Sequence, residues 1–266
     1  MANPAERADA RPAAELSIMA LTRIPLVRPG DDIADLILDG LANSGLTLRH
    51  GDVLVVAQKI VSKAEGRHVN LRAITPSARA EALAIEVGKD ARLVELILRE
   101  STEVVRHRTG VLIVAHRCGV VLANAGIDAS NIGPGGDDNQ VLLLPEDCDR
   151  SCGKIRARLA ALTGIEASVV IIDSLGRAWR NGTVGVALGA AGLPALLDLR
   201  GKRDLFDREL RTTQVGIADE IAAAASLLMG QANEGIPVVL VRGLKFSDTN
   251  GSANDLIRAR ELDLFR

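Results

Sequence analysis

Short, continuous runs of valine, isoleucine and leucine recur along the whole chain, separated by amphipathic stretches. Apolar runs of this length without polar alternation are typical of strands buried on both faces. Their alternation with amphipathic stretches indicates an α/β or mixed α+β architecture. The predicted strands are residues 52–57, 111–115, 120–123, 169–173 and 237–242.

The amphipathic stretches predict five helices, two of which have clear start signals. Thr75 is placed as an N-cap with Pro76 in the first helical turn, and Asp90 is placed to cap the next helix. Residues 133–139, rich in glycine and aspartate, are expected to form a mobile loop. The predicted helices are residues 31–44, 76–87, 90–100, 151–162 and 218–230.

The composition bounds the class of protein. The 266 residues suffice for one large domain or two smaller lobes; we expect a disordered tail at 1–15 and a single domain over 16–266. A net charge of −2 and 2% aromatic residues argue against nucleic-acid binding. The sequence contains no uninterrupted run of ~18 apolar residues, so no membrane span is predicted. Three cysteines fit reduced thiols in the cytoplasm better than a disulfide framework.

Polar, glycine-containing clusters follow several of the predicted strands. The first strand leads into Gln58, Lys59 and SKAEGR, a later one into NAGIDASN, and another into SLGRAWRNG. In sheets covered by helices, ligands bind beyond strand ends, where side chains leave the packed core but stay rigidly placed. The coincidence of three such clusters predicts a shared binding site.

Two carboxylates in these clusters are candidate metal ligands. Asp173 ends an apolar strand and is followed by Ser174, and Asp128 lies in NAGIDASN. Hard divalent cations such as Mg²⁺ and Mn²⁺ prefer oxygen ligands of this kind, and a pair of carboxylates can hold metal against phosphates. Each aspartate alone is equally well explained by turn formation.

Basic residues in the clusters have two interpretations each. Lys63 can supply a point charge for phosphate, or it can be a solvated surface lysine. Arg177 and Arg180 can clamp a carboxylate or phosphate, and Trp179 between them either stacks on a ring or, as we favour, packs in the core.

Other patterns exclude common catalytic sites. The sequence contains no P-loop motif, no dinucleotide-binding glycine motif opening a helix and no nucleophile elbow. Cys148 and Cys152 do not have metal-knuckle spacing and are expected in a loop. The histidines, expected at the surface or at edges, are His50, His68, His107 and His116. The residues alone therefore indicate an enzyme that handles a metal and phosphate.

Six segments together resemble the coenzyme F420-0:L-glutamate ligase family, also called gamma-glutamyl ligases. SKAEGR, NAGIDASN and D-[ST]-x-G-R-x-W-R-x-G are the most specific of the matches. They span the chain beyond its tail: RIPLVRPGDD (23–32), GDVLVVAQKIVSKAEGR (51–67), NAGIDASN (124–131), IIDSLGRAWRNGTVGVALGAAGL (171–193), ADEIAAAASLLMGQ (218–231) and IPVVLVRG (236–243).

The resemblance implies a two-lobed fold in an intertwined homodimer and a GTP-dependent reaction that joins L-glutamate to coenzyme F420-0 through an acyl phosphate. It implies Mg²⁺ or Mn²⁺, with K⁺ as a further cofactor, and allows addition of further γ-linked glutamates. The implied metal ligands are Asp128, Asp173, Ser174 and Gln231. The implied nucleotide contacts are Arg23, Ile24, Pro25, Leu26, Gln58, Lys59, Lys63, Asn131, Met229, Gly230 and Gln231. Catalytic roles fall on Lys63, Arg177 and Arg180.

The chain departs from the family pattern at two places. Gln58 and Lys59 stand where small polar residues are usual, and Asp207 stands where Gly-Arg-Glu-Leu has its glycine. The flavin-binding domain found after this one in some relatives is not expected here. Three other functions stay open: a ligase for another acid or amino acid, a GTP-binding module without chemistry, and a metal-dependent phosphohydrolase.

Overall fold

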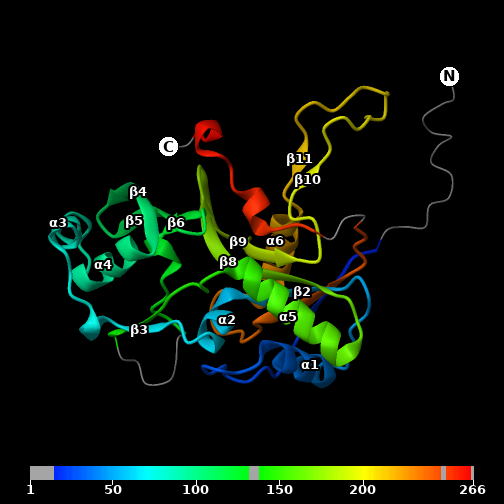
Figure 1. Ribbon diagram of the computed structural model, residues 1–266, viewed down its shortest axis with the longest axis horizontal. Helices are drawn as coiled ribbons and strands as arrows, with labels where there is room; N and C mark the ends of the chain where they lie inside the picture. The colour runs from blue at the N-terminus through cyan, green and yellow to red at the C-terminus, as the bar shows by residue number, and fades with distance from the viewer. Residues whose placement is uncertain (1–14, 132–137, 247–249, 265–266) are drawn as a thin grey trace.

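Five strands pair into one mixed sheet, which the computed structural model shows at the centre of the molecule (Figure 1). The structure describes residues 15–131, 138–246 and 250–264. All neighbouring strands are antiparallel except β2 and β8, which run parallel. The strands, in sheet order, are β1 (Ser17–Ala20), β12 (Val238–Arg242), β2 (Val53–Ala57), β8 (Ser168–Arg177) and β9 (Arg180–Ala191).

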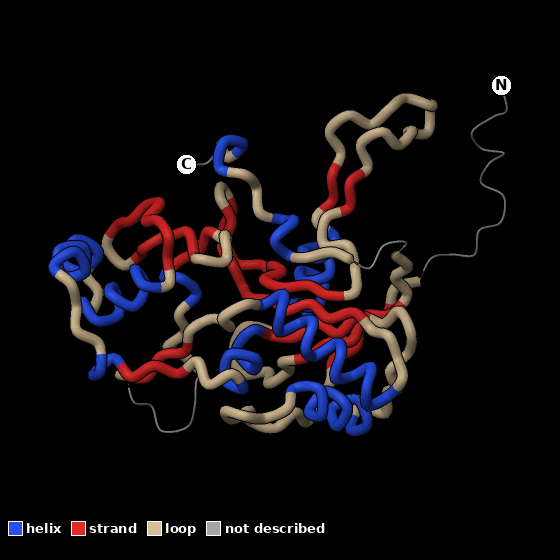
Figure 2. Tube along the Cα trace, in the orientation of Figure 1, coloured by secondary structure: helices blue, strands red, loops and turns tan. Residues whose placement is uncertain are grey.

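Helices cover both faces of this sheet, which explains why its strands are continuously apolar (Figures 1 and 2). In β2, Leu54 and Val56 pack into one core, whereas Val53 and Val55 pack into another, and all four are fully buried. The first core contains residues of α1 (Ile33–Asn43), α2 (Gln58–Ala64) and α5 (Cys148–Thr163). The second contains residues of α6 (Ile217–Met229).

Glycines in β9 let the helices approach the sheet closely on each side. A Cβ atom at Gly185 would overlap the carbonyl oxygen of Ala222 in α6, and one at Gly189 would overlap the backbone of Cys148 in α5. Glycine within a strand commonly marks such a close approach. The small residues of β9 therefore set the spacing of the layers.

A second group of elements has its own core beside the central sheet. The antiparallel strands β4 (Ser101–Arg108), β5 (Val111–His116) and β6 (Val121–Ala123) pack with α3 (Ala78–Val87) and α4 (Ala91–Arg99). The antiparallel pair β3 (His68–Asn70) and β7 (Gln140–Leu142) lies between this group and the central sheet (Figure 1). Short 3₁₀ helices are η2 (Leu71–Ala73), η3 (Asn124–Gly126), η4 (Ala253–Leu256) and η5 (Arg260–Leu262).

Residues 197–215 form an arm that extends away from the rest of the molecule (Figures 1 and 2). Its base is the antiparallel pair β10 (Leu197–Asp198) and β11 (Gln214–Val215). Leu205 is 90% exposed and Phe206 is 71% exposed. Asp207 has a φ of +65°, a left-handed conformation that glycine adopts freely and aspartate tolerates better than most residues. The departure from glycine at this position therefore keeps a glycine-like backbone.

All five predicted helices match in place and type, and one prediction about a start signal is wrong. Asp90 caps α4 as predicted, by accepting from the Arg92 N–H. Helix α3 begins at Ala78 and is capped by the Ser77 hydroxyl, not by Thr75. Ser77 is further fixed by Glu95, which accepts from both its N–H and its hydroxyl. Residues 1–14 of the predicted tail and residues 133–137 of the predicted mobile loop (133–139) lie outside the described residues.

Helix α5 begins earlier than predicted, at Cys148, with Asp147 as its N-cap. The expectation that Cys148 and Cys152 lie in a loop is therefore wrong: both are buried in the first core, on one face of this helix. All three cysteines are free thiols. Among the described residues, no helix combines the length and apolar composition that crossing a membrane requires.

Candidate active site

The parallel strands β2 and β8 bring two of the polar clusters to the same sheet edge. Ala57 pairs with Ile172, so Gln58, which follows β2, lies beside Asp173, the next residue of β8. Helix α2 begins immediately after β2. The short α2 therefore starts beside Asp173, at the same edge of the sheet.

A left-handed turn carries Asp128 to this edge from the second group of elements. Asn124, Ala125 and Gly126 have φ values of 52°, 55° and 65°, and a Cβ atom at Gly126 would press on Leu144. Asp128 then pairs with Leu142 through two backbone hydrogen bonds of 2.9 Å. This run of unusual backbone fixes where the aspartate lies.

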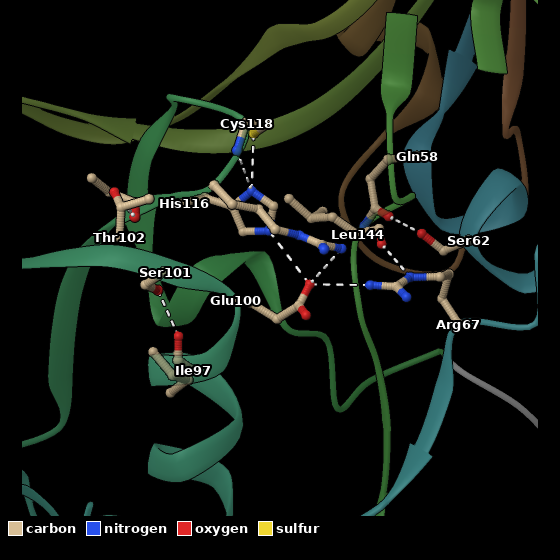
Figure 3. A network of polar contacts seen from close by, with 12 residues as sticks. Gln58, Ser62, Arg67, Ile97, Glu100, Ser101, Thr102, His116, Cys118 and Leu144 are labelled. Atoms are coloured by element: carbon tan, nitrogen blue, oxygen red, sulfur yellow. Dashed lines mark hydrogen bonds and ion pairs between the residues drawn. The ribbon is translucent and has the colours of Figure 1, made fainter. Parts of the chain in front are cut away.

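The Asp128 carboxylate is held by side chains of α2. Gln58 donates from Nε2 to Asp128 Oδ2 at 2.8 Å, and Lys59 Nζ lies 3.3 Å from Oδ1. Ser62 in turn donates to Gln58 Oε1 at 2.8 Å, which sets the orientation of the buried amide (Figure 3). Gln58 thus positions an acidic residue with its side chain. Ser62 was not singled out in the sequence, although its i, i+4 spacing from Gln58 on a helix is a readable signal.

Asp173 and Asp128 share the site electrostatically. Burial, and then the negative charge of Asp128, raise the pKa of Asp173 to about 6, while the Ser174 N–H donates to its Oδ1 at 2.8 Å. Two carboxylates that repel each other and offer hard oxygen ligands fit a divalent cation. No group of three or more histidine, cysteine or acidic residues with metal-binding geometry occurs in the described ranges. A cation here would therefore draw further ligands from Ser174, water or phosphate oxygens.

Lys63 is buried, so the interpretation as a solvated surface lysine is wrong. Its side chain is among the buried charged groups, and Nζ donates to the Asn131 carbonyl at 2.7 Å. Burial, and then the neighbouring charge of Lys59, lower the pKa of Lys63. Lys59 also donates to the Ser130 carbonyl at 3.2 Å. Both lysines of α2 therefore bind the segment immediately after Asp128.

The end of the segment ADEIAAAASLLMGQ (218–231) lies close to the residues after Asp128, through a contact made by Asn131. The Asn131 side-chain amide donates to the Ala232 carbonyl at 3.3 Å, just after Gly230 and Gln231. Gly230 has a φ of +71°, and a Cβ atom there would overlap the Glu234 carboxylate. Gln231 is exposed in this turn, whereas Met229 packs against the second core.

Other predicted residues lie apart from the two carboxylates. Arg177 and Arg180 are exposed near the tip of the β8–β9 hairpin, where Arg177 donates to the Asn181 carbonyl at 3.3 Å. The prediction that Trp179 packs in the core is wrong: it is 90% exposed, because it occupies the hairpin turn with a φ of +63°.

The first predicted nucleotide stretch, residues 23–26, runs beside α1. Ile24 packs against the first core, and Leu26 is 77% exposed. Farther along the chain, the Gly30 N–H donates to the carbonyl of Ala64 at the end of α2.

The sequence matches known proteins over nearly the whole chain. A family model described as F420-0:Gamma-glutamyl ligase matches residues 22–243, which contain all the groups above. The chain is 47% identical over 253 residues to the coenzyme F420:L-glutamate ligase of Methanothermobacter thermautotrophicus, covering 94% of this chain and 99% of the relative. It is 46% identical over 258 residues to the ligase of that name from Methanopyrus kandleri, with the same coverage. For the one from Archaeoglobus fulgidus the identity is 42% over 251 residues, covering 94% and 96%.

Proposed function

Because the chain belongs to the F420-0:gamma-glutamyl ligase family, we propose that it is a ligase that joins L-glutamate to coenzyme F420-0 through an amide bond. Relatives of this name align with nearly their full length. We further propose that GTP drives the reaction, that Mg²⁺ or Mn²⁺ and K⁺ assist it, and that further γ-linked glutamates can be added.

The observation that carries the metal and nucleotide proposal is the convergence of Asp128 and Asp173. They come from segments 45 positions apart in the numbering, and yet the charge of one raises the pKa of the other. Holding two partly buried carboxylates of like charge together is costly without a compensating cation. A bound divalent cation would neutralise phosphate charge and favour attack on phosphorus.

The chemistry of amide formation explains why a nucleotide is needed. A carboxylate is a poor acyl donor, because the attacking amine would have to expel oxide. We propose that an oxygen of the precursor carboxylate attacks the γ-phosphorus of GTP, which forms an acyl phosphate and releases GDP. The glutamate amine then attacks the acyl carbon, and inorganic phosphate leaves with the former carboxylate oxygen.

Lys63 is the residue we assign to charge stabilisation in this sequence. Its ammonium group is already desolvated and anchored at Asn131, so it needs little reorganisation to stabilise charge on a phosphoryl group. Lys59, now 3.3 Å from Asp128, would be free to bind phosphate if a cation were held by that carboxylate. Arg177 and Arg180, on the exposed hairpin, are left to orient the carboxylates of glutamate or of the precursor. The remaining nucleotide contacts stay as predicted from the sequence.

An isotope experiment tests the reaction directly. The protein is incubated with GTP, Mn²⁺, glutamate and coenzyme F420-0 labelled with ¹⁸O in its carboxylate. We expect a mass gain of one or more glutamyl units in the product and transfer of ¹⁸O to inorganic phosphate. A glutamylated product with unlabelled phosphate would refute the acyl phosphate while leaving the ligase assignment intact.

The competing functions predict different results in the same assay. A ligase for another acid releases phosphate only when that acid or amino acid is supplied. A phosphohydrolase releases phosphate without any amine acceptor, and a binding module retains GTP without glutamate-dependent turnover. We favour the ligase because the carboxylate pair, the buried lysine and the family relationship coincide.

We also propose that the protein is a two-lobed chain in a homodimer. The two groups of elements with separate cores support the lobes, and the arm with exposed Leu205 and Phe206 supports a subunit contact. Size-exclusion chromatography with light scattering should give a dimer mass, and Phe206→Ser should shift it toward the monomer. If the wild-type protein is a monomer, the arm does not form a subunit contact. The cytoplasmic location stays a prediction.

A further inference from the structure

A cysteine and a histidine are held together in the turn between β5 and β6. The turn is closed by hydrogen bonds from the His116 N–H to the Val120 carbonyl (2.9 Å) and from the Gly119 N–H to the His116 carbonyl (2.8 Å). Within it, His116 Nδ1 lies 3.0 Å from Cys118 Sγ and 3.1 Å from the Cys118 backbone nitrogen (Figure 3). The backbone conformation of this turn therefore holds the side chains of His116 and Cys118 next to each other.

A carboxylate completes the arrangement behind the imidazole. Glu100 Oε2 lies 3.7 Å from His116 Nε2, which is buried and has no hydrogen-bond partner. Arg67 Nη2 lies 3.1 Å from the same carboxylate oxygen (Figure 3). Arg117 Nη2 lies 3.2 Å from it. In enzymes with an activated nucleophile, a base lies next to the nucleophile and a third group orients the base. Here the Cys118 thiol, the His116 imidazole and the Glu100 carboxylate follow one another in that order. The expectation that His116 is a surface or edge residue is wrong, since the ring is 1% exposed.

The surroundings favour the charged forms of both groups. Burial opposes ionisation, but Cys118 and Glu100 together raise the pKa of His116. Burial likewise opposes the thiolate, but His116 lowers the pKa of Cys118, and a hydrogen bond from the Val120 backbone N–H lowers it further. Thiolates paired with a histidine cation are the reactive state of cysteine.

Cys118 opens onto a cavity of about 400 Å³ whose charged lining is mostly acidic. Three carboxylates, Glu146, Asp147 and Asp149, line it against one guanidinium, that of Arg117. The N-terminus of α5 adds about half a positive charge, which leaves the wall negative. The cavity therefore favours a small cationic reactant over an anionic one.

A second thiol in the cavity is poorly suited to react. Cys148 also lines it, but burial raises the pKa of Cys148. It stays protonated near neutral pH, and a protonated thiol does not attack a disulfide. Any adduct on Cys118 should therefore persist instead of being displaced by Cys148.

We propose that Cys118 is a modification site that forms mixed disulfides with small cationic disulfides of the aminothiol class. Its thiolate attacks one sulfur of the reagent, the reagent's S–S bond breaks, and a new S–S bond joins Cys118 to one half. The other half leaves as a thiolate and takes a proton from water. Cys118 is oxidised and the leaving half is reduced. This chemistry is independent of glutamate ligation.

The first test measures which cysteine of the native protein reacts, and at what pH. Alkylation by the neutral reagent iodoacetamide is followed by peptide mass spectrometry from pH 5 to 10. We expect Cys118 to be labelled before Cys148 and Cys152, with a rate that rises at lower pH than for a cysteine in an unfolded peptide. The groups that face the thiol and shape this profile are His116, Glu100, Arg67 and Arg117, with Asp147, Cys148 and Asp149 of α5. An unreactive Cys118, or an ordinary profile, would overturn the proposal.

A matched pair of variants isolates the imidazole. His116→Asn keeps an acceptor near the Nδ1 position but removes the cation. We expect alkylation of Cys118 at pH 7 to slow by roughly fivefold, because the thiolate fraction falls more than its nucleophilicity rises. Cys148→Ala should leave the rate unchanged. If folded His116→Asn protein is alkylated at Cys118 as fast as the wild type, His116 does not activate the thiol. If this variant does not fold, the pH dependence of Cys118 alkylation in the wild-type protein tests the proposal instead.

The charge preference is tested with two disulfides of opposite sign. Cystamine, a dication, should add one cysteamine unit to Cys118 faster than glutathione disulfide adds glutathione, and added salt should narrow the difference. Cys118→Ser should take up neither. Equal or reversed rates at low salt would refute the role of the acidic wall.

Discussion

Replacing Asp173 with asparagine is expected to abolish turnover and yet to stabilise the protein when no divalent cation is present. The substitution removes a partly buried negative charge that the charge of Asp128 disfavours, and asparagine Oδ1 can still accept the Ser174 N–H. The wild-type residue therefore costs stability in the absence of a ligand. Conflicts of this kind between function and stability are expected where like charges are brought together.

The size of the effect comes from the displaced pKa. A rise from 3.8 to about 6 corresponds to roughly 3 kcal/mol between the two protonation states. The new amide must find its own acceptor, which offsets about 1 kcal/mol. We therefore expect a net gain of about 2 kcal/mol at pH 8, or about 4–8 °C in Tm for a chain of this size.

The pH dependence gives the prediction a definite sign. Because the folded protein binds the Asp173 proton more tightly than the unfolded chain, this group favours folding at low pH and loses that contribution as pH rises through about 6. The advantage of Asp173→Asn should be full above that pH and should vanish toward pH 4.

Urea unfolding in EDTA between pH 4 and 8 measures this difference. Asp198→Asn, at an exposed carboxylate paired with Arg200, is the matched control and should give no gain. Mn²⁺ should raise the stability of the wild type more than that of Asp173→Asn. An Asp173→Asn protein that is no more stable than wild type at pH 8 in EDTA would refute the reasoning.

Three further substitutions have defined outcomes. Lys63→Ala should lower kcat by about 10²–10³-fold, as loss of a preorganised charge does, with Lys63→Arg restoring part of it in a steady-state assay. Arg242→Met should destabilise the fold by about 3–5 kcal/mol in urea unfolding, because Asp52, 1% exposed, keeps its charge without its partner at 2.7 Å. Gly185→Ala should cost about 1–3 kcal/mol in the same measurement, because the added methyl group meets the Ala222 carbonyl; no loss would mean that α6 shifts freely.

The sequence predicts best where a single physical rule dominates. Continuous apolar runs identified β2, β8 and β12, since only burial on both faces accounts for them. Strand β9 was missed because its glycines and alanines, which the closely packed helices require, make it look neither apolar nor alternating. Strand β4 was missed for another reason: STEVVRHR is mostly polar and exposed.

The site shows the same division. The polar clusters and the family resemblance pointed to Asp128 and Asp173, and the pairing of β2 with β8 places Asp173 beside the start of α2. The prediction that a strand ends at Asp173 is wrong, because β8 continues to Arg177 before the chain turns into β9. The contact from Gln58 to Asp128 was not predicted, because it joins residues 70 positions apart. His116 was misjudged for a related reason: the carboxylate that makes its burial tolerable comes from the end of a different element.

The placement of the two site carboxylates has a mechanical consequence. Asp128 comes directly after Ile127, which packs with the small sheet, whereas Asp173 extends from Ile172 in the core beneath α6. A cation bound by both carboxylates would link the two groups of elements, which have separate hydrophobic cores. Cation binding would thus make the unfolding of the two groups more cooperative. The thermal unfolding transition should then be narrower with the cation bound than without it.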